Sequence, residues 1–370
     1  MKHDKKKIVV VLITIVIISV GLYCATKYGK YNTMEVVKTH GSIGNDNGNY
    51  AQYLDGVLKY SKDGVTMLTQ EGKQIWNQSC QMAHPIMEMN EGIVAIADQR
   101  GTSIMVFEET GLKGEIRTTK PIEKITVSNQ GIVAAILQDT QSPQVICYDA
   151  KGTVLVEHNA SFESTGYPLD VAISEDGTTL LVTYLCTDGN KIVTKAVFYN
   201  FGKAGENKKD FQVAEKKYED SIIPTVAFID NNTSLLISDH AFIFYEGINS
   251  PKEKNVIELD TEIKSVAYNE KYIAFVLKSK TESGFELRLY RTNGKQVMSV
   301  SLENEYTNVK IEGNDIVLYT GNACAIYNEK GIRKFEGTVE GNIIEIFPIV
   351  GFQKYMMIST NGFEEVHLVK

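Results

Sequence analysis

Histidines are the residues of this chain best suited to bind a transition metal, but their spacing does not form a site. His40, His84, His158, His240 and His367 lie far apart, and no HxH or HxxxH pair occurs. When structural repeats supply metal ligands, we expect the histidines at equivalent positions in each repeat, because the coordination geometry is fixed. These histidines do not recur in that way, so we predict no metal site and no cofactor.

Carboxylates are the next candidates, because paired acids carry out general acid and base catalysis. Adjacent acidic residues occur as Glu108–Glu109, Glu219–Asp220 and Glu364–Glu365. Neighbouring residues of a strand point to opposite faces, so such pairs rarely share one site. A Gly-x-Ser-x-Gly elbow, a phosphate loop and a dinucleotide fingerprint are also missing from the sequence. We therefore assign no catalytic, cofactor-binding or metal-binding residue.

Cysteines offer neither a zinc motif nor a clear disulfide pattern. Cys80, Cys147, Cys186 and Cys324 are scattered, with no CxxC spacing among them. Three of the four lie within apolar, strand-like runs, which favours buried free thiols. Their spacing alone leaves their pairing open.

The N-terminus has the pattern of a membrane anchor. Residues 1–7 include four lysines, and the run from Ile8 to Ala25 contains no charged residue. About 18 helical residues span roughly 27 Å, close to the thickness of the bilayer core. Fewer cations follow the run, so we predict a cytoplasmic tail at 1–7, a single transmembrane helix at 8–25, and the remaining chain outside the cell. Tyr23, just before Cys24, disfavours cleavage as a signal peptide or a lipoprotein signal.

The net charge of the residues after the predicted anchor limits which partners they can bind. The formal net charge is −8, although the first seven residues are basic. The remainder is therefore acidic, and no basic cluster offers a surface for a polyanion. We expect no nucleic-acid partner.

Beyond residue 50 the chain repeats one unit of four short, β-branched or aromatic runs separated by Gly, Asn and Asp turns. The units begin near Tyr50, Pro85, Pro121, Pro168, Ile223, Ile263, Thr307 and Ile343. Glycines at 72, 152, 294 and 331 occupy one recurring turn, where a positive φ is expected. Units of about 40 residues are typical of propeller blades. We predict an all-β fold, a β-propeller of eight four-stranded blades over residues 50–370, with seven blades as the alternative.

The last unit lacks a strand, and residues 26–49 offer two ways to account for it. Met34–Lys38 has β propensity and could complete the last blade, which would close the ring and remove an open edge. Alternatively, 26–49 is a plain stalk.

Several motifs resemble those of known propellers. Glu71–Trp76 resembles the blade signature of quinoprotein-like propellers, and Ser-x-Asp-Gly occurs at 61–64 and 174–177. With Gly166–Asp170 and Val197–Gly202, their order resembles an uncharacterised family of membrane-anchored propeller-like proteins, related to the quinoprotein and WD40 folds, from Gram-positive anaerobes. The resemblance implies a propeller at the membrane and supplies no activity.

These features favour a membrane-anchored extracytoplasmic binding or scaffolding module that is not an enzyme. Its expected partners are the lipid bilayer, through Ile8 to Ala25, and a protein or glycan of the cell envelope. The alternative is a propeller hydrolase or lyase acting on cell-wall polysaccharide, and a sensor that signals through another membrane protein is a third reading.

Two polar stretches, Asn200–Glu219 and Gly247–Lys254, are expected to be recognition loops or neutral insertions. Core packing is the favoured role of the aromatic cluster of Tyr167, Phe198, Tyr199 and Phe201, and lining a binding face is the alternative.

Overall fold

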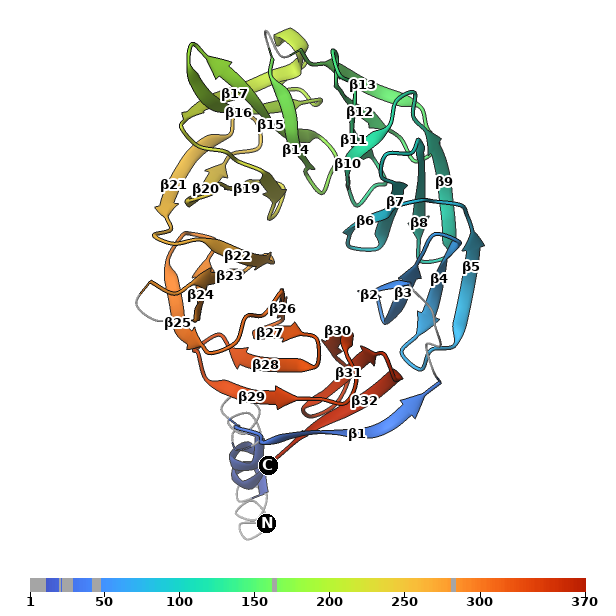
Figure 1. The fold of residues 1–370 in the computed structure, drawn as a ribbon, viewed down its shortest axis with the longest axis vertical. Helices are drawn as coiled ribbons and strands as arrows, with labels where there is room; N and C mark the ends of the chain where they lie inside the picture. The colour runs from blue at the N-terminus through green and yellow to red at the C-terminus, as the bar shows by residue number, and fades with distance from the viewer. Residues whose placement is uncertain (1–10, 20, 22–28, 42–47, 162–164, 281–283) are drawn as a thin grey trace, which may run out of the picture.

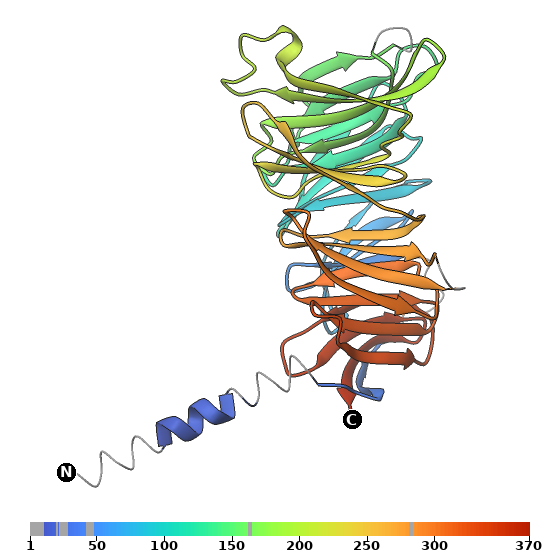
Figure 2. The same ribbon diagram turned by 90° about the vertical axis from the view of Figure 1, so that its left-hand side faces the viewer.

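The protein is a closed ring of eight antiparallel sheets (Figure 1). The computed structural model describes residues 11–19, 21, 29–41, 48–161, 165–280 and 284–370. Within these residues, thirty-two strands form eight sheets of four strands each. Seen edge-on, the ring is a disc that is thinner than it is wide (Figure 2). The prediction of eight blades is therefore confirmed over the seven-bladed alternative.

Each blade contributes one strand to each of four concentric positions. The innermost strands are β2 (Asn49–Tyr53), β6 (Pro85–Asn90), β10 (Ile122–Val127), β14 (Tyr167–Ile173), β18 (Thr225–Phe228), β22 (Ile263–Tyr268), β26 (Asn308–Glu312) and β30 (Ile343–Pro348). The second strands are β3 (Gly56–Tyr60), β7 (Ile93–Asp98), β11 (Val133–Leu137), β15 (Thr179–Asp188), β19 (Thr233–Ile237), β23 (Tyr272–Lys278), β27 (Asp315–Thr320) and β31 (Lys354–Ser359). The third strands are β4 (Gly64–Thr69), β8 (Ser103–Glu108), β12 (Gln144–Tyr148), β16 (Lys191–Asn200), β20 (Ala241–Glu246), β24 (Phe285–Arg291), β28 (Ala323–Asn328) and β32 (Gly362–Val369). The outermost strands are β5 (Gln74–Ser79), β9 (Gly111–Arg117), β13 (Val154–Asn159), β17 (Gln212–Glu219), β21 (Lys252–Glu258), β25 (Gln296–Leu302), β29 (Arg333–Thr338) and β1 (Thr33–His40). We number the blades 1 to 8 from β2 to β30, and every predicted unit start lies within two residues of an innermost strand.

Blade 8 combines the two ends of the chain. β1 pairs antiparallel with β32 from Thr33 opposite Val369 to His40 opposite Phe363, and this pairing closes the ring. The strand predicted at Met34–Lys38 thus fills the place that the last unit lacked. Just before it, Tyr31 N donates a hydrogen bond of 2.7 Å to Lys334 O on blade 7.

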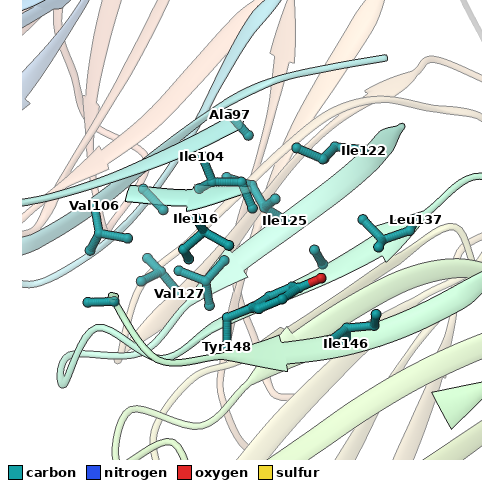
Figure 3. Packing of buried hydrophobic residues seen from close by; sticks show 14 of the residues in the cluster. Ala97, Ile104, Val106, Ile116, Ile122, Ile125, Val127, Leu137, Ile146 and Tyr148 are labelled. Carbon is teal, nitrogen blue, oxygen red and sulfur yellow. The ribbon is translucent and has the colours of Figure 1, made fainter. Parts of the chain in front are cut away.

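The core lies between adjacent blades. The middle strands of a blade are covered on both faces by its neighbours, so they are continuous apolar runs, as in Val133–Leu137, which is fully buried. Figure 3 shows one such layer, in which Ile104 and Ile116 of blade 2 meet Val127 and Tyr148 of blade 3. Because no single sheet covers its own apolar faces, the repeats are stable only when stacked.

The glycine turns have the predicted conformation. Gly72, Gly152, Gly294 and Gly331 have φ values between 76° and 87° and join the third strand of a blade to the fourth. At Gly152 a β-carbon would lie 3.4 Å from the nearest atom, Glu115 O, so the turn requires glycine for its backbone conformation and not for space.

Two predicted loops are partly strand. Within Asn200–Glu219, the part from Gln212 onward is β17, and the connection is limited to 201–211, which includes a short 3-10 helix at Lys209–Phe211. Within Gly247–Lys254, β21 already begins at Lys252. Both misassigned strands are outermost, where one face meets solvent, so their composition is polar and resembles that of a loop.

Three of the four residues of the predicted aromatic cluster are core, whereas Tyr167 is half-buried at the start of β14 and belongs to neither of their layers. Phe198 and Tyr199 are buried in two different interblade layers, and Phe201 packs at the edge of one of them. The cysteines also follow the prediction: Cys147, Cys186 and Cys324 are buried free thiols, and Cys80 is half-buried and free.

At the N-terminus, residues 11–19 are helical. Among the described residues, no helix has both the length and the apolar character needed to cross a bilayer. The predicted anchor at 8–25 lies partly outside the described residues, and the predicted tail at 1–7 lies wholly outside them.

Candidate binding site in the central channel

The innermost strands enclose a cavity of about 660 Å³ at the centre of the ring. Its lining comes from β2, β6, β10, β14, β18 and β22, with Tyr60 at the end of β3. Six of the eight blades therefore contribute to one space, and residues far apart in the chain face each other across it.

A recurring irregularity in the innermost strands helps to direct side chains in this region. The pairing register between the first and second strands shifts just before Lys124, Asp170, Ser265 and Glu345, in blades 3, 4, 6 and 8. Such β-bulges bend a strand and redirect a side chain. Three of the four residues that follow the shift are charged, in strands that are otherwise mainly apolar.

Lys124 and Asp170 form an ion pair between blades 3 and 4. The Lys124 Nζ lies 2.9 Å from the Asp170 Oδ1 and also donates to Pro224 O at 3.3 Å. The second carboxylate oxygen of Asp170 accepts a hydrogen bond from Val226 N at 2.8 Å. Burial raises the pKa of Asp170, while Lys124 and these hydrogen bonds act in the opposite direction. Both side chains are thus held by blades 3 to 5.

Glu88 faces the same cavity from β6 without such a partner among the described residues. Burial, together with the smaller effect of Asp170 and against that of Lys124, raises the pKa of Glu88 to about 7. The side chain is nevertheless exposed to solvent. The Glu88 carboxyl reaches water through the channel and is surrounded by protein on its other sides. This position accounts for both its exposure and its raised pKa.

Two tyrosines share this space with Glu88. Tyr268 is 41% exposed, although it lies on an innermost strand, and burial together with Glu88 and Asp170 raises its pKa to about 12. Burial, followed by Glu88 and Glu345, raises the pKa of Tyr60. The channel therefore presents the Glu88 carboxyl and two phenol hydroxyls beside the Lys124–Asp170 pair.

A second ion pair lies on blades 7 and 8. Lys310 pairs with Glu345, whose side chain is 6% exposed and whose Oε1 also accepts a hydrogen bond of 2.9 Å from Ile346 N. Burial raises the pKa of Glu345 against the effect of Lys310. Burial raises the pKa of Glu312, and the nearby Glu345 raises it further by a smaller amount.

The structure does not bring the histidines together. His158 stacks on Tyr199 at a centroid distance of 4.2 Å, and His240 Nδ1 contacts Asp239 at 2.7 Å. His84 precedes β6, while His40 and His367 lie on β1 and β32. Within the described ranges, no three His, Cys, Asp or Glu side chains converge as a metal site.

The adjacent acidic pairs do not form catalytic pairs either. Glu108 pairs with Lys113, and Glu219 pairs with Lys191 on the surface. Glu365 pairs with Lys354, whereas its neighbour Glu364 accepts a hydrogen bond from Ser359 Oγ at 2.8 Å. The two members of that pair point in different directions, as expected for a strand.

Sequence reasoning missed Glu88, Lys124 and Asp170. The available signal was a charged residue within the apolar first strand of a unit, as in Met87-Glu88-Met89 and Leu169-Asp170-Val171. A charge within such a strand needs a partner or a route to water, so it indicates a channel-facing position.

Comparisons with known proteins agree with this architecture. The sequence model of a family of unknown function (DUF5711) matches residues 27–368. The crystal structure of BamB from Moraxella catarrhalis is similar with a TM-score of 0.56 at 12% identity, covering 90% of this chain and 97% of that one. The crystal structure of AztD from Citrobacter koseri gives 0.56 at 11% identity, covering 80% and 87%. No curated protein is similar in sequence. At these identities the two structures establish a shared fold only.

Proposed function

The chain belongs to the DUF5711 family of unknown function, and from that premise we propose that it is a membrane-anchored extracytoplasmic binding or scaffolding module and not an enzyme. Ile8 to Ala25 is the anchor in this proposal, residues 1–7 are cytoplasmic, and the propeller lies outside the cell membrane. The apolar run and the excess of lysines before it support this arrangement.

We place the binding site at the central channel, and the partner is a protein or glycan of the cell envelope. One observation carries this proposal: Lys124 and Asp170 are committed to each other, whereas Glu88, Tyr60 and Tyr268 line the cavity without a described partner. Uncommitted polar groups around a concave space are typical of ligand sites. Hydroxyls and a carboxyl suit a partner rich in hydrogen-bond donors.

A hydrolase or lyase acting on cell-wall polysaccharide is the second candidate. The raised pKa of Glu88, about 7, suits a general acid at neutral pH, and Asp170 is a second carboxylate of the cavity, whose lining also includes Glu123. The ion pair with Lys124 weighs against this function, because Asp170 would have to leave that pair to act as a base or nucleophile.

Variants of the channel distinguish these functions. The full-length chain in detergent micelles should retain an envelope protein or glycan, and Glu88→Gln combined with Tyr268→Ala should abolish that retention. Glu258→Gln, an exposed glutamate on the outermost strand β21, is the matched control and should bind as the wild type does. Equal binding by all three proteins would contradict a channel site. If the wild-type protein instead releases reducing ends from purified wall polysaccharide, and Glu88→Gln by itself abolishes this release, the protein is a polysaccharide-cleaving enzyme.

A further inference from the structure

One turn of blade 8 is apolar where the corresponding turns of other blades are polar. β30 and β31 are joined by 349–353, in which Val350 is 96% exposed and Phe352 is 41% exposed. Five-residue turns at the same place in blades 3 and 4 read Ser-Asn-Gln-Gly-Ile (128–132) and Ser-Glu-Asp-Gly-Thr (174–178). Nothing in the described chain covers Val350, so its apolar surface is available to a partner.

This turn lies next to the point where the chain enters the ring. Leu368 N donates a hydrogen bond of 3.0 Å to Gln353 O in the turn. The following residue, Val369, accepts a hydrogen bond of 2.9 Å from Asn32 N. Figure 1 shows β1, β32 and the C-terminus together at this edge of the ring. The apolar turn and the residues that lead to the N-terminus therefore occupy the same edge.

The connection between this edge and the apolar run is short. Tyr31 is 8% exposed and is hydrogen-bonded to blade 7, so it is already part of the ring. Only residues 26–30 separate it from Ala25. Six steps of at most about 3.6 Å limit the separation of Ala25 and Tyr31 to roughly 20 Å. The headgroup region is about 5–8 Å deep on each side, so an anchor at 8–25 holds this edge against the bilayer.

We propose that Val350 and Phe352 insert into the headgroup region of the membrane, as a second contact beside the anchor. This inference rests on the proposed anchor. Apolar side chains flanked by cations are typical of segments that bind the membrane interface. Two lysines are exposed at this edge: Lys30, which precedes β1, and Lys370, which follows β32. A second contact restricts the tilt of the ring relative to the membrane, so the turn limits the directions in which the channel can open.

Site-directed fluorescence quenching tests the contact on the full-length chain. Val350→Cys is made in a Cys24→Ser, Cys80→Ser background and labelled with an environment-sensitive dye, and the protein is reconstituted into vesicles of phosphatidylcholine and phosphatidylglycerol that carry a spin label near the headgroup. Gln130→Cys is the matched control, because it is exposed on the equivalent turn of blade 3. We expect the label at 350 to be quenched about threefold more than at 130, because an apolar interfacial segment is buried about 5–10 Å into the headgroup and acyl boundary, where the spin label lies.

Flotation of the same vesicles in alkaline carbonate separates the two proposals. If the chain floats and position 350 is quenched no more than position 130, the turn does not touch lipid and the inference is wrong while the anchor stands. If the chain does not float, the anchor itself is refuted, and the inference falls with it.

Discussion

Lys310 is the cation paired with Glu345, and its removal gives a measurable test of how blades 7 and 8 are joined. The Glu345 side chain is 6% exposed, whereas the Lys310 side chain is 29% exposed. Removing one partner of a buried ion pair costs about 3–5 kcal/mol, because the other charge stays buried. Since Lys310 is partly solvated, we take the lower end and expect Lys310→Met to reduce the free energy of unfolding by about 3 kcal/mol. With an unfolding entropy of about 2 cal/mol/K per residue, this loss lowers the Tm of a ring of this size by about 4 °C.

The pKa of Glu345 determines whether stability rises or falls with pH. Burial raises the pKa of Glu345 above its ordinary value of 4.5. The folded chain therefore keeps this proton at pH values where the unfolded chain has lost it, and stability falls as the pH rises above 4.5. Loss of Lys310 raises the folded pKa further, so the deficit of Lys310→Met should be large at pH 8 and smaller at pH 5.

Thermal unfolding of the full-length chain, followed by circular dichroism at the two pH values, is the assay. Lys310→Met with Glu345→Gln should recover most of the lost stability, because the buried Glu345 carboxylate is then gone and Glu312, which is half-buried, no longer has Glu345 as a neighbouring negative charge. Lys264→Met is the matched control, because Lys264 is 28% exposed but its partner Glu262 is 58% exposed. The Tm of this variant should equal that of the wild type. A Lys310→Met variant as stable as Lys264→Met, with the same Tm shift at both pH values, would refute the reasoning.

Two further predictions concern the turns and the thiols. Gly152→Ala should lower the free energy of unfolding by about 1–2 kcal/mol, because φ is 87° there and alanine disfavours that region. Gly92→Ala, whose φ is not left-handed and whose nearest atom would be 3.9 Å away, is the control in chemical denaturation, and an equal loss in both would contradict the φ argument. In a Cys24→Ser background, a thiol reagent should modify Cys80 alone in the native protein, since Cys147, Cys186 and Cys324 are buried and burial raises the pKa values of Cys147 and Cys324 to about 12. Mass spectrometry that finds a second thiol modified without denaturant would show that the interblade core opens.

Most of the ring could be predicted from the sequence, because each blade repeats one pattern. The second strand of a unit is buried on both faces, so runs such as Val133–Leu137 mark every blade. The outermost strands were harder to assign, as Gln212–Glu219 shows: only one of its faces is covered, and its polar residues resemble those of a loop.

The candidate site could not be predicted in the same way. Glu88, Lys124 and Tyr268 belong to blades 2, 3 and 6, and they come together only because the ring closes around one axis. Their effects on one another, such as the rise in the pKa of Tyr268 caused by burial and by Glu88, depend on distances across the channel that no spacing along the chain encodes.

The sequence alone predicted the four-stranded repeat, with eight units favoured over seven, the glycine turns with positive φ and the burial of three thiols, because these properties arise from local strand periodicity and backbone sterics. Tertiary structure decided which charges are paired, which polar groups remain uncommitted in the channel, and that the apolar turn at Val350 lies beside the entry of β1. These relations join residues as far apart as Asn32 and Val369, and such contacts exist only when the chain returns to its own beginning.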